Sequence, residues 1–125
     1  MQKMKKLPDA EFEIMKTVWA SEPPVTTNMI MQNLGNDKEW LIQTVVTLMA
    51  RLVERGFLRS EKHGKERLYF PLISREEYLN FETGNFIRQY HGDSFSHLVK
   101  TLNENKTLTD EDIDELYEFI KERKN

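Results

Sequence analysis

The fold is decided by residues 41–72, which read LIQTVVTLMARLVERGFLRSEKHGKERLYFPL. Apolar residues recur at helical spacing through the first half of this stretch, so we expect a helix over residues 41–55. Gly56 would end it, because glycine readily adopts the left-handed backbone of a helix C-terminus. The buried face would hold Val45, Leu48, Met49 and Leu52. The opposite face would hold Gln43, Thr44, Thr47 and Arg51, with Val46 at the border.

The second half of the stretch predicts a β-hairpin. Residues 57–62 and 66–72 contain strand-forming side chains on either side of His63-Gly64-Lys65, a tight loop with a glycine. Pro71 would end the second strand, because proline lacks the N–H that a sheet ladder needs. Acidic residues are outnumbered in this region by Arg51, Arg55, Arg59, Lys62, Lys65 and Arg67. The helix and the hairpin are therefore locally basic.

Two further helices precede this stretch. The first is expected over residues 7–19, where apolar side chains at helical spacing form one face. A break with two prolines follows at residues 21–24. Thr26 or Thr27 would then cap a second, short helix that ends at Gly35.

The order helix, helix, helix, hairpin predicts a winged helix-turn-helix, which is a DNA-binding domain, over residues 1–72. In this fold the second helix lies across the phosphate backbone and the third helix enters the major groove. Gln43 would then bond adenine, and Val46 would contact a thymine methyl group. Thr44 and Thr47 would bond base edges. The expected phosphate contacts are Arg51, Lys62, Lys65 and Arg67, together with the backbone at Thr26 and Thr27.

The rest of the chain, residues 73–125, predicts a helical dimerisation domain. Helices are expected over residues 75–90 and 94–102, and Thr109 with Asp112 would begin the last one. Their apolar side chains have no sheet or long helix of their own to pack on. A second copy of the chain would bury them, although packing onto residues 1–72 is an alternative. The predicted dimer contacts are Tyr78, Phe81, Phe86, Ile87, Tyr90, Phe95, Leu98, Val99, Leu102, Ile113, Leu116, Tyr117 and Ile120.

Charge and composition agree with this division and with a fold that is mainly α with one small hairpin. The chain has 125 residues, a formal net charge of -3 and no cysteine, which excludes disulfides, cysteine zinc sites and iron–sulfur clusters. Residues 1–72 hold 11 Lys+Arg and 9 Asp+Glu, a net of +2, whereas residues 73–125 hold 7 and 12, a net of -5. No apolar run is long enough to span a bilayer, so we expect a cytoplasmic protein without membrane insertion.

No pattern of catalysis or cofactor binding stands out. The sequence has no glycine-rich phosphate loop and no nucleophile elbow, so we expect neither an enzyme nor a bound cofactor. His63, His91 and His97 are isolated in the sequence, apart from Asp93 near His91. No metal site is predicted from them.

Several stretches resemble the BlaI/MecI family of penicillinase repressors. Residues 7–15, LPDAEFEIM, and 18–19, VW, are similar to the opening of that family. Residues 40–52, WLIQTVVTLMARL, followed by Gly56-Phe57-Leu58, resemble its third helix and the exit from it. The likeness extends to residues 108–116, LTDEDIDEL, and so covers nearly the whole chain.

The resemblance implies a dimeric transcriptional repressor. Members of the family bind inverted-repeat operators of double-stranded DNA and dimerise through their C-terminal helices. They repress genes for β-lactamases or penicillin-binding proteins. They are released from DNA when a membrane β-lactam sensor triggers proteolysis in the C-terminal part.

Three positions depart from the family pattern. Leu41 stands where serine or threonine is frequent, and Val46 stands where some relatives have a long polar side chain. The Asn-Phe bond that is cut in inducible relatives corresponds to Thr101-Leu102. Two alternatives therefore remain open, a repressor of this family that answers a signal other than β-lactams, and a winged helix that binds protein instead of DNA.

Overall fold

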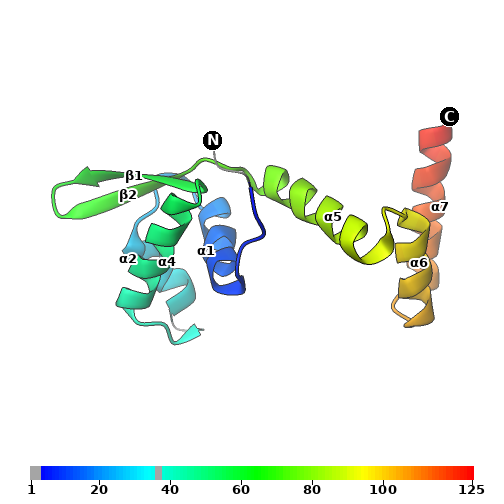
Figure 1. Cartoon of the computed structure of the whole chain (residues 1–125), viewed down its shortest axis with the longest axis horizontal. Helices are drawn as coiled ribbons and strands as arrows, with labels where there is room; N and C mark the ends of the chain where they lie inside the picture. Colours follow the sequence, from blue (N-terminus) through cyan, green and yellow to red (C-terminus); the bar gives the residue numbers. More distant parts are fainter. Residues whose placement is uncertain (1–3, 36–37) are drawn as a thin grey trace. The chain divides into compact units, whose positions relative to one another are not determined.

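The computed structural model describes residues 4–35 and 38–125 and divides into two compact units after Glu82. The first unit contains α1 (Asp9–Trp19), α2 (Thr27–Ile30), η1 (Met31–Gly35), α4 (Ile42–Glu54), β1 (Leu58–His63), β2 (Glu66–Pro71) and the start of α5 (Arg75–His91). The second unit contains the rest of α5, α6 (Phe95–Glu104) and α7 (Asp110–Lys124). The predicted fold, mainly α with one two-stranded hairpin, is confirmed (Figure 1).

A proline and a threonine cap mark where the first two helices begin. The predicted helix over residues 7–19 starts later, at Asp9, because the residue before a proline favours an extended backbone. Leu7 precedes the helix and is buried in the core, with 2% of its surface exposed. Of the two candidate caps, Thr26 caps α2, since its Oγ1 accepts a hydrogen bond from the Met29 N–H at 3.2 Å. A π-helical turn, η1, follows α2 and ends at Gly35, the residue predicted to close this helix.

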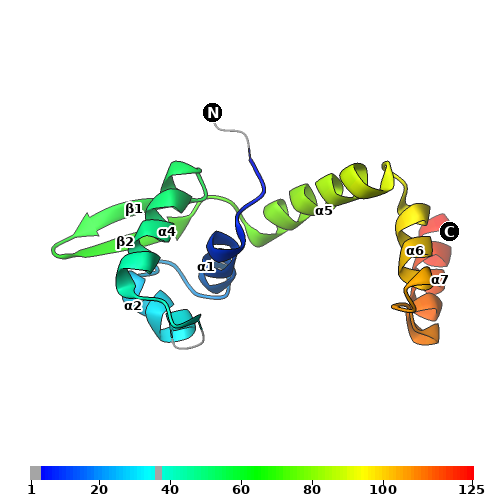
Figure 2. The same cartoon turned by 60° about the horizontal axis from the view of Figure 1, so that its bottom comes forward.

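The hairpin is antiparallel and is tied to the start of α2. Its register pairs Leu58 with Pro71 and His63 with Glu66. Val25 and Tyr69 exchange backbone hydrogen bonds of 2.9 and 2.8 Å, which adds a short third segment beside β2. Both views show the two strands extending away from the helices of this unit (Figures 1 and 2). The hairpin base is therefore held at a defined place relative to α2 and α4.

The core of the first unit lies between α1, α2, α4 and the hairpin base. The predicted inner face of α4 is confirmed, because Val45, Leu48, Met49 and Leu52 are all buried. The start of α5 also belongs to this core. Tyr78 is 3% exposed, and its ring packs edge-on against Phe57 with centroids 5.5 Å apart. Its hydroxyl accepts a hydrogen bond from the Leu7 N–H at 2.8 Å.

This packing corrects part of the predicted dimer surface. Tyr78 was predicted to contact a second copy, but the chain itself buries it against the first unit. Phe81 also packs against that core. The compact units accordingly divide inside α5, and not between residues 72 and 73. The helix that leaves the hairpin is thus anchored to the first unit by its own aromatic residues.

A buried ion pair also holds α1 against the C-terminus of α4. The Glu11 side chain is 2% exposed, and its Oε1 lies 2.6 Å from the Arg55 Nε. Glu11 shares a helix face with Ile14, Met15 and Val18, all of which are buried. A carboxylate on a buried helix face needs a partner. Arg55, predicted only as one of several surface cations, supplies it.

The second unit is stabilised by capped helices but has a thin interior. Ser94 caps α6 through a 3.1 Å hydrogen bond from the His97 N–H. Thr109 and Asp112 form a complete capping box at the start of α7, as predicted. No side chain of residues 83–125 is fully buried. Across the described residues, none of the helices is both long and apolar enough to cross a membrane.

Candidate nucleic-acid interface

Three elements of the first unit meet at one groove, which we call the α2–α4–hairpin groove. Its lining combines the start of α2, one side chain of α4, the hairpin turn and β2. The lining residues are Thr26, Thr27, Asn28, Val46, Lys65, Glu66, Arg67 and Tyr69. These are the elements that a winged helix brings to DNA. The structure thus brings together five of the predicted DNA contacts, namely Thr26, Thr27, Val46, Lys65 and Arg67.

The outer face of α4 carries the other predicted contacts. Gln43, Thr44, Thr47 and Arg51 are all exposed. Val46 is 41% exposed, so it belongs to this outer surface and not to the core. Leu41 precedes the helix without a side-chain cap and is 74% exposed. The N-terminal half of α4 therefore presents amide, hydroxyl and apolar groups, the chemistry that reads base edges in a major groove.

The basic side chains fall into two groups. Arg55 is bonded to Glu11, and Arg59 Nη1 lies 2.6 Å from Glu61 Oε1. Arg59 also stacks on Phe70 at 4.1 Å from the ring centroid. In contrast, Arg51, Lys62, Lys65 and Arg67 are exposed, and none of them forms an ion pair within residues 4–35 and 38–125. These four are the side chains predicted to contact phosphates.

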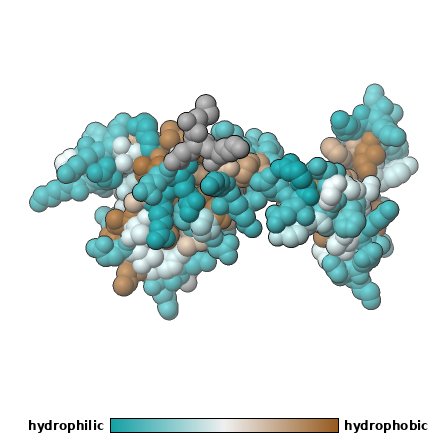
Figure 3. Space-filling model, in the orientation of Figure 1, coloured by the Kyte–Doolittle hydropathy of each residue, from teal (hydrophilic) through white to brown (hydrophobic). Residues whose placement is uncertain are grey.

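Acidic groups shape the field around this surface. The hydrogen bond from Arg59 lowers the pKa of Glu61, so this carboxylate stays ionised and offsets the Arg59 charge. Glu66 lies in the groove between Lys65 and Arg67 in sequence and is exposed. Its charge would repel a phosphate there. Figure 3 shows hydrophilic residues covering the hairpin on the visible face.

Thr26 and Thr27 are less accessible than expected for backbone phosphate ligands. Both are half-buried at the groove. The Thr26 hydroxyl is already used by the Met29 N–H, as described above. These two residues therefore line the wall of the surface, whereas Lys65 and Arg67 form its exposed edge.

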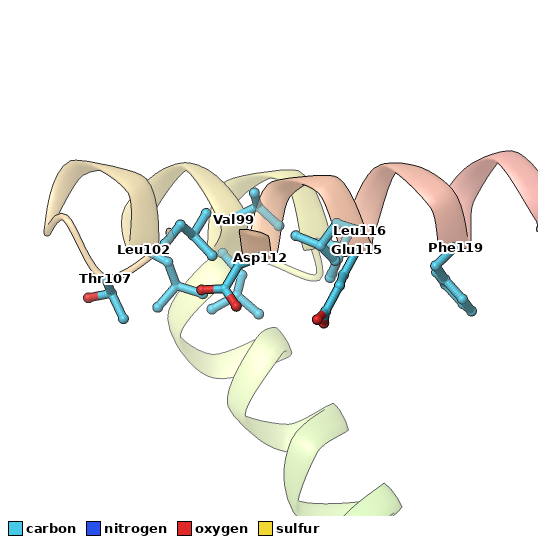
Figure 4. Close-up of a pocket in the computed structure, with 10 residues that line it drawn as sticks. Val99, Leu102, Thr107, Asp112, Glu115, Leu116 and Phe119 are labelled. Carbon is cyan, nitrogen blue, oxygen red and sulfur yellow. The ribbon is translucent and has the colours of Figure 1, made fainter. Parts of the chain in front are cut away.

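The second unit has a surface of a different kind. An apolar groove runs between α6 and α7, and Val99, Leu102, Leu116 and Phe119 are among its lining (Figure 4). Large apolar side chains of this unit that are also exposed are Phe86, Tyr90, Phe95, Ile113, Tyr117, Phe119 and Ile120. The Thr101-Leu102 bond lies inside α6, and the Thr101 hydroxyl donates to the His97 carbonyl oxygen at 2.8 Å.

Two histidines that are isolated in the sequence come together in space. Gly92 and Asp93 both have positive φ, 57° and 63°, and form the corner between α5 and α6. The corner places His91 Nδ1 2.7 Å from His97 Nδ1. Within the described residues, no three His, Asp or Glu side chains lie close enough to hold a metal ion.

Comparison with known proteins gives one consistent set of relatives. A family model described as penicillinase repressor matches residues 7–122. The Bacillus licheniformis penicillinase repressor is 30% identical over 125 residues, 100% of this chain and 97% of that protein. The methicillin resistance regulatory protein MecI of Staphylococcus aureus is 27% identical over 91% of this chain and 92% of its own length.

Two solved structures resemble the first unit. The DNA-binding domain of the repressor BlaI in solution matches with a TM-score of 0.55 and 32% identity, over 62% of this chain and 94% of that one. The monomeric form of Bacillus licheniformis BlaI in complex with the blaP half-operator matches with a TM-score of 0.51 and 32% identity, over the same shares of the two chains.

Proposed function

This chain belongs to the penicillinase repressor family and is a DNA-binding repressor of the BlaI/MecI type, and on that premise we propose that it acts as a dimer on inverted-repeat operators. One observation carries the proposal most directly. Four cations, Arg51, Lys62, Lys65 and Arg67, lie on α4 and the hairpin, are exposed and form no ion pair within the described residues. They flank the polar outer face of α4, as a surface for a duplex requires.

In the proposed complex, one set of side chains reads the base sequence and another set positions the protein on the duplex. Gln43, Thr44 and Thr47 contact base edges in the major groove. Arg51 and the hairpin cations contact phosphates and fix the register of α4 on the duplex. Thr26 and Thr27 support the backbone contact from the wall of the groove.

Dimerisation is proposed for the second unit. Residues 83–125 bury no side chain fully, yet they expose several aromatic and aliphatic residues. A second copy would cover them and complete the interior that one copy lacks. The proposed contacts are Phe86, Ile87, Tyr90, Phe95, Leu98, Val99, Leu102, Ile113, Leu116, Tyr117 and Ile120. Two-fold symmetry would then present two α4 helices to half-sites one DNA turn apart, ~34 Å.

Proteolysis in the second unit is the proposed route of release. The Thr101-Leu102 bond is the position that the family resemblance indicates, but it lies within a hydrogen-bonded helix. A protease reaches such a bond only after local opening. Cleavage there would separate α7 from most of α6 and so remove the dimer surface. A membrane β-lactam sensor would act indirectly on this step, and a signal other than β-lactams remains the alternative.

The test is binding to a duplex from the promoter of the protein's own gene. Fluorescence anisotropy is measured at two salt concentrations, with a scrambled duplex as the control. Tight binding to the promoter duplex only, weakened steeply by salt, is expected. Equal binding to both duplexes, or none to either, contradicts an operator in this promoter, and leaves either an operator elsewhere or a winged helix that binds protein.

Two variants distinguish side chains that read bases from side chains that contact phosphates. Gln43→Ala should cost ~1–3 kcal/mol on the promoter duplex and little on the scrambled one. Lys65→Ala should weaken binding to both duplexes and flatten the salt dependence. Lys16→Ala, on α1, makes the same change in net charge outside the groove and should bind as the unchanged protein does. If Lys65→Ala behaves like Lys16→Ala, the hairpin does not contact phosphates.

A further inference from the structure

The start of α4 exposes three apolar side chains, which we call the apolar tip. Leu41 is 74%, Ile42 46% and Val46 41% exposed. Ile42 and Val46 are four residues apart on one helix, so they are neighbours on its surface. Leu41 lies directly before the first turn. Exposed apolar side chains at one end of a helix favour binding of a partner that presents an apolar group there.

The surroundings of the apolar tip indicate which partner that is. The same end of α4 exposes the polar Gln43 and Thr47, and Val46 shares its groove with Lys65 and Arg67. Protein interfaces are enriched in aromatic side chains and depleted in lysine, whereas the apolar tip holds only aliphatic side chains and Val46 shares its groove with Lys65. Cations around an apolar spot fit a polyanion that displays small apolar groups. Duplex DNA displays one such group in its major groove, the C5 methyl group of thymine.

Resting on the proposed operator binding, we propose that the apolar tip reads thymine by its methyl group. Val46, at the meeting point of α2, α4 and the hairpin, contacts one thymine, and Ile42 or Leu41 contacts a neighbouring one. The preference for these base pairs then comes from apolar contact, while Gln43 and the threonines supply hydrogen bonds to other base edges. The consequence is an operator half-site with thymines at positions where loss of the methyl group weakens binding.

The expected effect follows from the size of a methyl group. Burying one CH2-sized group contributes about 0.8 kcal/mol, which corresponds to about a fourfold change in affinity. Deoxyuridine differs from thymidine only by that methyl group and keeps the same hydrogen-bonding groups. Replacing a contacted thymine by deoxyuridine should therefore weaken binding about fourfold, and replacing an uncontacted one should change nothing.

The experiment uses a duplex selected by the full chain from a random-sequence library. Each thymine of the selected duplex is replaced in turn by deoxyuridine, and binding is measured by anisotropy at one salt concentration. The unchanged protein is compared with Leu41→Ala, Ile42→Ala and Val46→Ala. Leu72→Ala is the matched control, because Leu72 is 53% exposed, follows β2 and does not line the α2–α4–hairpin groove.

The result that supports the inference has two parts. The unchanged protein and Leu72→Ala should lose about fourfold at one or two thymines. At least one of the three tip variants should bind thymine and deoxyuridine equally at one of those positions. The inference is overturned if every deoxyuridine duplex binds like its thymine parent, or if all three variants keep the full discrimination. If the library yields no enriched duplex at all, operator binding itself fails, which is a different result.

Discussion

Replacing Arg55 by alanine should destabilise the first unit far more than replacing Arg59. The two arginines make ion pairs of the same length, since each donor nitrogen lies 2.6 Å from a glutamate oxygen. Their partners differ in burial, because the Glu11 side chain is 2% exposed and that of Glu61 is 46% exposed. The two pairs therefore share one distance and differ in the burial of the glutamate, while Arg59 also makes its stacking contact with Phe70.

The magnitudes follow from that burial. Removing one partner of a buried pair costs 3–5 kcal/mol, and water that reaches Arg55, whose side chain is 37% exposed, lowers the expected cost of Arg55→Ala to about 3 kcal/mol. Arg59→Ala breaks an exposed pair and should cost ~1 kcal/mol or less. Glu11→Gln with Arg55→Ala should cost less than the sum of the two single changes, because the double variant leaves no unpaired charge.

The assay is urea unfolding at pH 7 followed by tryptophan fluorescence. Trp19 and Trp40 both lie in the first unit, so the signal reports that unit. All variants are measured at one protein concentration, since association with a second copy would shift the midpoint. Equal losses for Arg55→Ala and Arg59→Ala, or additive losses in the double variant, would refute the idea that burial of Glu11 decides the energy.

Three further outcomes are expected. Tyr78→Phe should cost ~1–3 kcal/mol of unfolding free energy, because the buried Leu7 N–H loses its acceptor. Burial raises the pKa of the Tyr78 hydroxyl, so the unchanged protein should lose stability above about pH 10, where the unfolded chain ionises first. Urea midpoints measured across this pH range should fall less for Tyr78→Phe than for the unchanged protein. Glu66→Gln should bind duplex DNA more tightly at low salt, with the gain fading as salt rises, because one charge that repels phosphate is removed from the groove; an unchanged anisotropy titration would place phosphates away from Glu66. Leu116→Asp changes a proposed dimer contact that lines the α6–α7 groove, so it should shift sedimentation toward the monomer and weaken binding to a full operator, while binding to a half-site stays the same; a dimer that survives would remove the α6–α7 groove from the interface.

The elements could be predicted because their signals are local. Apolar residues at helical spacing over residues 41–55 predict α4, and a glycine loop between two strand-forming runs predicts the hairpin. The capping box at Thr109 needs only residues three apart in the chain. The exposed contacts Gln43, Thr44 and Thr47 follow from the same periodicity, because a residue opposite the buried face of a helix faces solvent.

The site was predicted only in part, since charge alone does not say which cations are available. Arg55 and Arg59 look like Lys62 and Lys65 in the sequence, but they are paired with Glu11 and Glu61. A signal for the first pair was present, because Glu11 falls on the buried stripe of α1. The meeting of His91 with His97 had no comparable signal, as it depends on the tight corner at Gly92 and Asp93.

The order of helices and strands, the polar outer face of α4 and the likeness to penicillinase repressors all follow from the amino-acid sequence. Each of these rests on residues within a few positions of one another. Three features emerge only from the packed chain: Tyr78 belongs to the first unit, Arg55 neutralises Glu11, and the hairpin turn and β2 share a groove with Val46. These contacts join residues that are far apart along the chain. Leu7 and Tyr78 are 71 residues apart, and Glu11 and Arg55 are 44 apart, so only packing of the whole unit brings these groups into hydrogen-bonding distance.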